Sequence, residues 1–153
     1  LEKAIEAAVE DGLIAIGKQV QKLAVAFCPR DTGELSRSIS WATATKHSAT
    51  MSSFAGIKHD GSKHSVLIGT TAPYAAWVEY GTGLWDSRGT PHRIYPTTKT
   101  YMRWVGKRDG KVHFARSTRG MMARPFLRRA ARGVNIKAVF NQAVSESLRK
   151  RIK

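Results

Sequence analysis

The sequence predicts an α+β fold in which a long N-terminal helix and a C-terminal helix pack on a small antiparallel sheet. Apolar residues recur every three or four positions over 1–27 and again over 136–148, which is the period of an amphipathic helix. Short alternating runs and a hairpin pattern, both typical of strands, lie between them. With 153 residues, 42% of them hydrophobic, we expect a single domain over 1–153.

The first helix is predicted to cover nearly all of residues 1–27. Gly12 and Gly17 either weaken it, by about 1 kcal/mol each relative to alanine, or let a neighbour pack closely. Pro29 ends it. The apolar stripe of this helix consists of Leu1, Ile5, Val9, Leu13, Ile16, Val20, Leu23 and Phe27.

A short helix or turn and then a strand should follow. Asp31 and Glu34 have the spacing of a capping box, and Leu35 and Ile39 lie on the apolar side of the turn. The alternation over 39–45 predicts the strand.

The next segments are an expected mobile loop and a second strand. Residues 46–64 are rich in Ser, Lys, His and Gly, and we expect a loop with a short strand near 54–57. Residues 65–69 predict a compact buried strand.

Residues 72–83 are predicted to form a short helix that ends in a glycine turn. Pro73 suits the first turn of a helix. Tyr74, Trp77 and Val78 then share one apolar face, and Gly81 is placed to end the helix in a left-handed conformation. Two interpretations remain open. Either this is a core helix with a turn, or Glu79 and the 81–83 turn project to meet a partner.

The last part of the chain predicts a loop, a hairpin and two helical stretches. Residues 84–100 should be an irregular, mobile loop, and 101–115 a hairpin that turns at 108–110. A basic connector then leads to a helix with Pro125 at its first position. A break near 133–135 precedes the final amphipathic helix.

Positive charge is concentrated at the C-terminal end. The formal net charge is +15, of which residues 1–102 contribute +2 and residues 103–153 contribute +13. Such a field attracts a polyanion or an acidic protein face, although a solvated surface that only aids solubility is the alternative. The candidate residues facing DNA or another anion are Arg116, Arg119, Arg124, Arg128, Arg129 and Arg132.

The sequence nominates no catalytic, cofactor or metal site. It has no phosphate loop, HExxH or CxxC pattern, and the single cysteine, Cys28, is expected to be a small buried hydrophobe. His59 and His64 have only weak metal-ligand spacing. No apolar run is long enough to cross a membrane, and no secretory signal is recognisable. We therefore expect a binding or structural protein and not an enzyme.

Three motifs, in this order, resemble one protein family. They are P-x-D-T-G-x-L at 29–35, Y-A-x-x-V-E-x-G-T at 74–82 and P-F-[LM]-x-x-A at 125–130. The set is similar to the tail-completion or neck proteins of long-tailed double-stranded DNA phages, often called minor tail components. The motif residues proposed for the fold or an interface are Asp31, Thr32, Gly33, Leu35, Tyr74, Trp77, Glu79, Tyr80, Gly81, Thr82, Gly83, Pro125 and Phe126.

The resemblance implies a structural virion protein with a fold similar to tail-terminator subunits. It implies a homo-oligomeric ring, of six subunits, that joins the head-completion or connector proteins to a tail terminator or tail tube. Double-stranded DNA would pass through the ring, which would assemble in the host cytoplasm. Six copies at +15 would carry about +90, so DNA or an acidic neighbour must offset their repulsion.

Two other classes of function compete with this interpretation. The basic composition also suits a free-standing nucleic-acid-binding protein. A nuclease that uses His92 or His113 is the enzyme alternative, although no third group that would position either histidine is recognisable.

Overall fold

A computed structural model describes residues 1–152 and divides the chain into two compact units. Unit 1 comprises Leu1–Ala75 together with the chain from Pro125 onward, and unit 2 comprises Ala76–Arg124. The predicted α+β class is confirmed, with long helices near both ends and two small antiparallel sheets. The expectation of a single domain over 1–153 stays a prediction.

Helix α1 (Glu2–Phe27) is the central element of unit 1, and its predicted extent is confirmed. Leu13, Ile16 and Val20 of the predicted stripe are buried. At the N-terminal end the stripe does not become core, because Leu1 is 88% and Ile5 is 47% exposed. The most deeply buried residues of α1 are instead small side chains such as Ala8 and Ala24, which let neighbouring elements approach its backbone.

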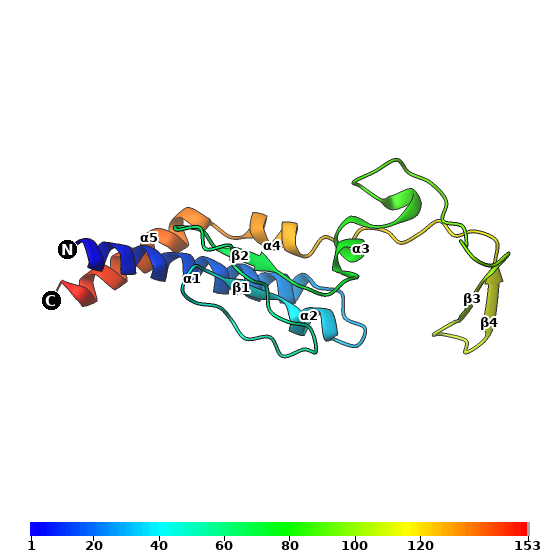
Figure 1. Ribbon diagram of the computed structural model, residues 1–153, viewed down its shortest axis with the longest axis horizontal. Coiled ribbons are helices and arrows are strands. Elements are labelled where there is room, and N and C mark those ends of the chain that lie inside the picture. The colour runs from blue at the N-terminus through cyan, green and yellow to red at the C-terminus, as the bar shows by residue number, and fades with distance from the viewer. Residues whose placement is uncertain (153) are drawn as a thin grey trace. The chain divides into compact units, whose positions relative to one another are not determined.

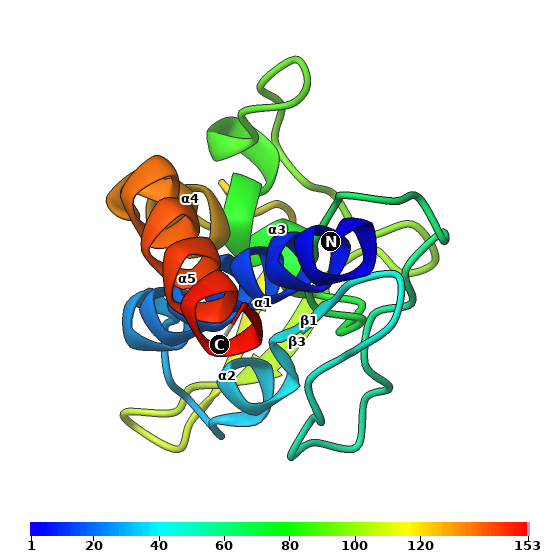
Figure 2. The same ribbon diagram turned by 90° about the vertical axis from the view of Figure 1, so that its left-hand side faces the viewer.

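Helices α4 (Leu127–Gly133) and α5 (Ile136–Arg151) pack against α1, with α5 antiparallel to it (Figures 1 and 2). Gly12 permits this contact, because a Cβ there would lie 2.6 Å from the ring of Phe140. The predicted break is confirmed, and Asn135 caps α5 by accepting a hydrogen bond from the backbone N–H of Ala138. Pro125 is not the first helical residue as predicted, since α4 begins two residues later.

Strands β1 (Ser40–Ala42) and β2 (Leu67–Gly69) form an antiparallel pair in the register Trp41 opposite Ile68. Gly17 of α1 lies under Trp41, where a Cβ would be 2.9 Å from the indole Cγ. All three residues of β1 are buried, whereas alternation predicts one solvated face. Strand β2 is more exposed than predicted, with Leu67 42% exposed.

The segment 46–64 covers the sheet and contains no helix or strand in the described chain, apart from a bridge at His47, so the strand expected near 54–57 is wrong. Its backbone is nevertheless tied down. The Ser48 N–H donates to the Trp41 carbonyl at 2.9 Å, and the Ile57 N–H donates to the hydroxyl of Ser40 at 3.0 Å. This cover explains why β1 is buried on both faces.

The predicted capping box would start a helix directly after Asp31, but helix α2 (Glu34–Ser38) begins three residues after it. Its N-cap is Gly33, in a left-handed conformation with φ 78°, and not Asp31. The carboxylate of Glu34 accepts hydrogen bonds from the N–H and the hydroxyl of Ser53. The predicted capping box is therefore wrong, because a residue 19 positions away engages the glutamate.

Unit 2 contains residues 76–83 of the predicted helix and glycine turn, and the hairpin. Helix α3 (Ala75–Tyr80), whose first residue belongs to unit 1, leads into the 3₁₀ helix η1 (Gly83–Trp85). Strands β3 (Met102–Val105) and β4 (Val112–Ala115) form the predicted antiparallel hairpin. Its turn uses Gly110 at φ 64°, as the sequence indicates.

Candidate functional site

The turn at 81–83, which follows α3, pairs with the backbone of the connector at 119–124. The Thr82 N–H donates to the Met121 carbonyl at 2.9 Å, and the Thr82 hydroxyl accepts from the Met121 N–H at 2.9 Å. The Leu84 N–H donates to the Arg119 carbonyl at 2.8 Å. Three hydrogen bonds thus join two segments that lie almost 40 residues apart in the chain.

Glycine is required on both sides of Thr82. Gly81 ends α3 at φ 81°, which confirms its predicted left-handed conformation, and Gly83 has φ 64°. A Cβ at Gly81 would lie 2.5 Å from the Trp85 carbonyl oxygen, and a Cβ at Gly83 would lie 2.5 Å from the Arg119 carbonyl oxygen. The motif glycines therefore allow the backbone of the connector to come close.

The side chains of α3 are arranged differently from the predicted core face. Trp77 is 55% exposed, so the prediction that it packs in the core with Tyr74 and Val78 is wrong at this position. Glu79 is only 3% exposed, and its carboxylate does not project into solvent. Tyr80 lies under the guanidinium of Arg88, whose carbon is 4.9 Å from the ring centroid. Whether this segment contacts a partner stays a prediction.

The other two motifs belong to unit 1 and divide into core and surface residues. Leu35 is 5% exposed, and Phe126 is fully buried, so both stabilise the core. Asp31 and Thr32 are exposed, and the Thr32 carbonyl accepts a hydrogen bond from the guanidinium of Arg37 at 3.3 Å. Tyr74, the first residue of the motif at 74–82, also belongs to unit 1 and packs edge-on against Phe54. Asp31, Thr32 and the likewise exposed Pro125 are thus motif positions here that a partner could reach.

The six candidate arginines are divided between the two units. Three of them, Arg116, Arg119 and Arg124, are exposed on unit 2. The other three, Arg128, Arg129 and Arg132, are exposed on α4 in unit 1. Some are engaged locally: Arg116 lies over the ring of Tyr101, and Arg129 lies 4.3 Å from the ring centroid of Phe27.

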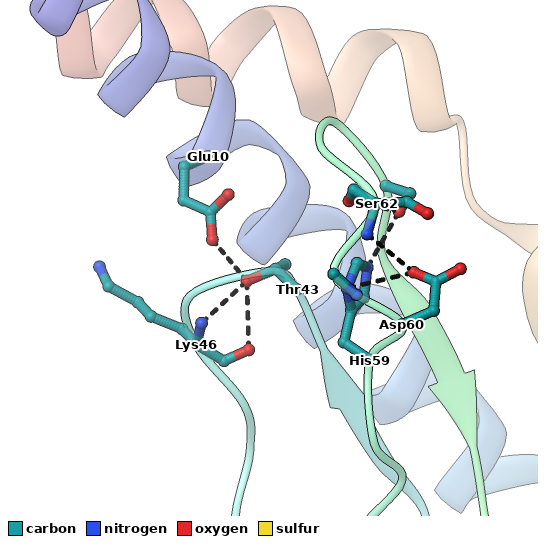
Figure 3. Close-up of polar contacts among 8 residues, drawn as sticks. Glu10, Thr43, Lys46, His59, Asp60 and Ser62 are labelled. Atoms are coloured by element: carbon teal, nitrogen blue, oxygen red, sulfur yellow. Dashed lines mark hydrogen bonds and ion pairs between the residues drawn. The ribbon is translucent and has the colours of Figure 1, made fainter.

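A polar cluster joins α1 to the end of β1 (Figure 3). The carboxylate of Glu10 accepts hydrogen bonds from the hydroxyls of Thr43 and Thr45. Burial raises the pKa of Glu10, but these hydrogen bonds outweigh burial, and the pKa lies below its ordinary value. Asp11, also on α1, accepts hydrogen bonds from two residues of α5, the Ser147 hydroxyl and the Arg151 guanidinium. Both hydrogen bonds lower the pKa of Asp11.

His59 is held within its own loop by contacts at both ring nitrogens. The Gly61 N–H donates to its Nδ1 at 3.0 Å, and its Nε2 lies 2.9 Å from the hydroxyl of Ser65. The same Nδ1 lies 3.5 Å from a carboxylate oxygen of Asp60. Both ring nitrogens are occupied within the loop that Figure 3 shows.

No metal cluster is recognisable over residues 1–152, but His113, for which the sequence reveals no positioning group, has its Nε2 3.0 Å from the Asp109 carboxylate. No group of three or more His, Cys, Asp or Glu in that range could hold a metal ion. Cys28 is buried as predicted, and burial raises the pKa of its thiol to about 11, so it is a poor nucleophile. Among the described helices, none is both long and apolar enough to span a membrane.

The structure also shows a surface that the sequence analysis missed. On the β3–β4 hairpin, Arg103 pairs with Phe114 and Val105 pairs with Val112, so all four side chains lie on one face. Three of these side chains are apolar and exposed: Phe114 is 65%, Val105 is 56% and Val112 is 44% exposed. Cross-strand pairing of the alternating residues could have revealed this face, which we call the hairpin face.

Comparison with known protein families identifies a match. A family model described as "Bacteriophage HK97-gp10, putative tail-component" matches residues 1–81, slightly more than half of the chain. No curated protein and no solved structure matches the chain. The matched region includes the motif at 29–35 and most of the motif at 74–82, but the motif at 125–130 lies outside it.

Proposed function

Because the chain belongs to the HK97-gp10-like family of bacteriophage tail components, we propose that it is a ring-forming subunit of the phage neck. In this role a hexameric ring joins the head-completion complex to the tail tube, and DNA passes through its lumen. The subunit shapes and holds this joint and catalyses no reaction. The family match is the observation that carries the proposal.

Exposed aromatic side chains support an oligomer. Trp77 is 55%, Trp85 is 44% and Phe114 is 65% exposed. Such side chains are enriched at protein interfaces.

The charge distribution supports a polyanion or an acidic ring as neighbour. Unit 2 carries ten Lys or Arg against three Asp or Glu, and the chain beyond it carries eight against one. We assign the exposed arginines of the connector, Arg116, Arg119 and Arg124, to the lumen. There they would neutralise phosphates without reading sequence.

Mass measurement and negative-stain imaging of the purified protein test the proposal. Closed rings, or stacks of rings, are the expected result, and a chain that stays monomeric at high concentration would contradict it. A salt titration with duplex DNA tests the lumen. Weak binding that falls steeply with salt and is indifferent to sequence is expected. Tight binding by an isolated monomer would instead favour a free-standing nucleic-acid-binding protein.

A further inference from the structure

We propose that the hairpin face docks on the N-terminal turns of α1 of a second copy of this chain, and that this contact closes the ring. The inference rests on the proposed ring function, since it names the surfaces that meet between adjacent subunits. The hairpin face is Arg103, Val105, Val112 and Phe114. Its counterpart, which we call the acidic helix face, is Glu2, Ile5, Glu6 and Val9.

The hairpin face requires a cover. A two-stranded hairpin is marginally stable alone in water, and this one exposes three apolar side chains on the same face. On the opposite face Trp104 and His113 already stack, with ring centroids 5.5 Å apart. The hairpin face is therefore the side of the hairpin that gains most from a contact.

Charge identifies the kind of surface that fits. Residues 99–116 contain six Lys or Arg and one acid, Asp109. That acid is already engaged, because its carboxylate accepts from the Lys111 N–H at 3.1 Å and lies 3.0 Å from His113 Nε2. The partner should therefore combine an apolar centre with a negative rim. Two hairpin faces suit each other less well, because a two-fold contact would bring two basic hairpins together.

The acidic helix face has the complementary character. Residues 2, 5, 6 and 9 follow the spacing of one helical face, with an exposed apolar Ile5 between two exposed acids. Glu2 and Glu6 form no ion pair within the described chain. Residues 1–11 contain four of the eleven acids of the chain. Duplex DNA offers only the charge, since its phosphates and sugars would leave Val105 and Phe114 without an apolar partner.

Two different surfaces that meet between copies make a head-to-tail contact. Such a contact produces a ring when its rotation closes. Each subunit would then use its hairpin face on one neighbour and its acidic helix face on the other.

Charge reversal tests this pairing. The hairpin variant carries Arg103→Glu, on the hairpin face, and Arg108→Glu, in the exposed turn next to it. The helix variant carries Glu2→Lys and Glu6→Lys. Each variant alone places like charges against each other, so we expect assembly to require at least about tenfold higher protein concentration. Sedimentation velocity of the full chain measures this. Lys18→Glu with Lys22→Glu, two exposed substitutions on α1 that reverse the same amount of charge, is the matched control and should assemble like the wild type.

Mixing gives the decisive result. Equimolar hairpin and helix variants should assemble together, because the acidic hairpin of one meets the basic helix of the other. A chain with all four substitutions should also recover assembly. If the four-substitution chain recovers but the mixture does not, the hairpin docks within its own chain, and the proposal is wrong.

The remaining outcomes separate this inference from the proposed function. If both variants assemble like the wild type, the ring contact lies elsewhere and only the inference fails. If the hairpin variant assembles normally but loses binding to duplex DNA, the occupant is DNA and the inference fails. If the wild-type chain never assembles, the ring function and the inference fail together.

Discussion

Replacing Gly17 with alanine is expected to destabilise unit 1, although alanine is the better helix former. Alanine gains about 1 kcal/mol of helix propensity over glycine. Against this, the new Cβ would lie 2.9 Å from Cγ and 3.1 Å from Cδ2 of Trp41. Trp41 is only 6% exposed and is fixed in β1, so it cannot move away freely. Overpacking costs about 1–3 kcal/mol, and a Cβ closer than 3 Å to a fixed ring belongs in the upper half of that range, so after the gain in propensity the net loss should be about 1–2 kcal/mol.

Unfolding by urea, followed by circular dichroism at 222 nm, measures this loss. The signal reports mainly on unit 1, because α1, α4 and α5 belong to it. Gly133→Ala is the matched control, since its Cβ would meet only the end of the flexible Leu23 side chain, at 3.3 Å. In a Trp41→Ala background Gly17→Ala should no longer destabilise. A Gly17→Ala protein as stable as the wild type would refute the account of how α1 packs on the sheet.

Three further predictions concern other parts of the chain. The hydrogen bonds that lower the pKa of Asp11 stabilise its charged form, so this contribution is present above about pH 4 and is lost as pH falls through the lower folded pKa. Asp11→Asn should therefore flatten part of the loss of unfolding free energy below about pH 4, measured by urea titration. An unchanged slope would contradict this. The Cys28 thiol, with its pKa raised to about 11, should react with a disulfide reagent at pH 8 far more slowly in the native than in the denatured chain, and equal rates would show that it is accessible. Gly83→Ala should loosen the paired turn and speed tryptic cleavage at Arg119, whereas Gly89→Ala, where a Cβ meets nothing within 4 Å, should leave the cleavage rate unchanged.

The long helices could be predicted from the sequence because their signals are local. The apolar period over 1–27 and the break at 133–135 depend only on neighbouring residues, and both are confirmed. Gly12 and Gly17 left two alternatives open, weakening or close packing. The structure decides for close packing, because Phe140 and Trp41 occupy the space that side chains would fill.

Features set by distant contacts could not be predicted from local pattern. Glu34 satisfies the capping-box spacing, but Ser53 engages it from another segment. Strand β1 is buried on both faces because the irregular segment 46–57 covers it, which no periodicity reveals. Likewise, the glycines at 81 and 83 were recognisable as turn residues, but their pairing with the connector depends on residues almost 40 positions away.

Locating the chain in assembled particles tests the central claim most directly. Phage particles whose copy of this chain carries a small C-terminal tag can be labelled with gold and imaged by electron microscopy. A neck subunit should give one cluster of label per particle, at the joint between head and tail. Label along the tail, label at its distal tip, or no label in purified particles would contradict the assignment of this subunit to the neck.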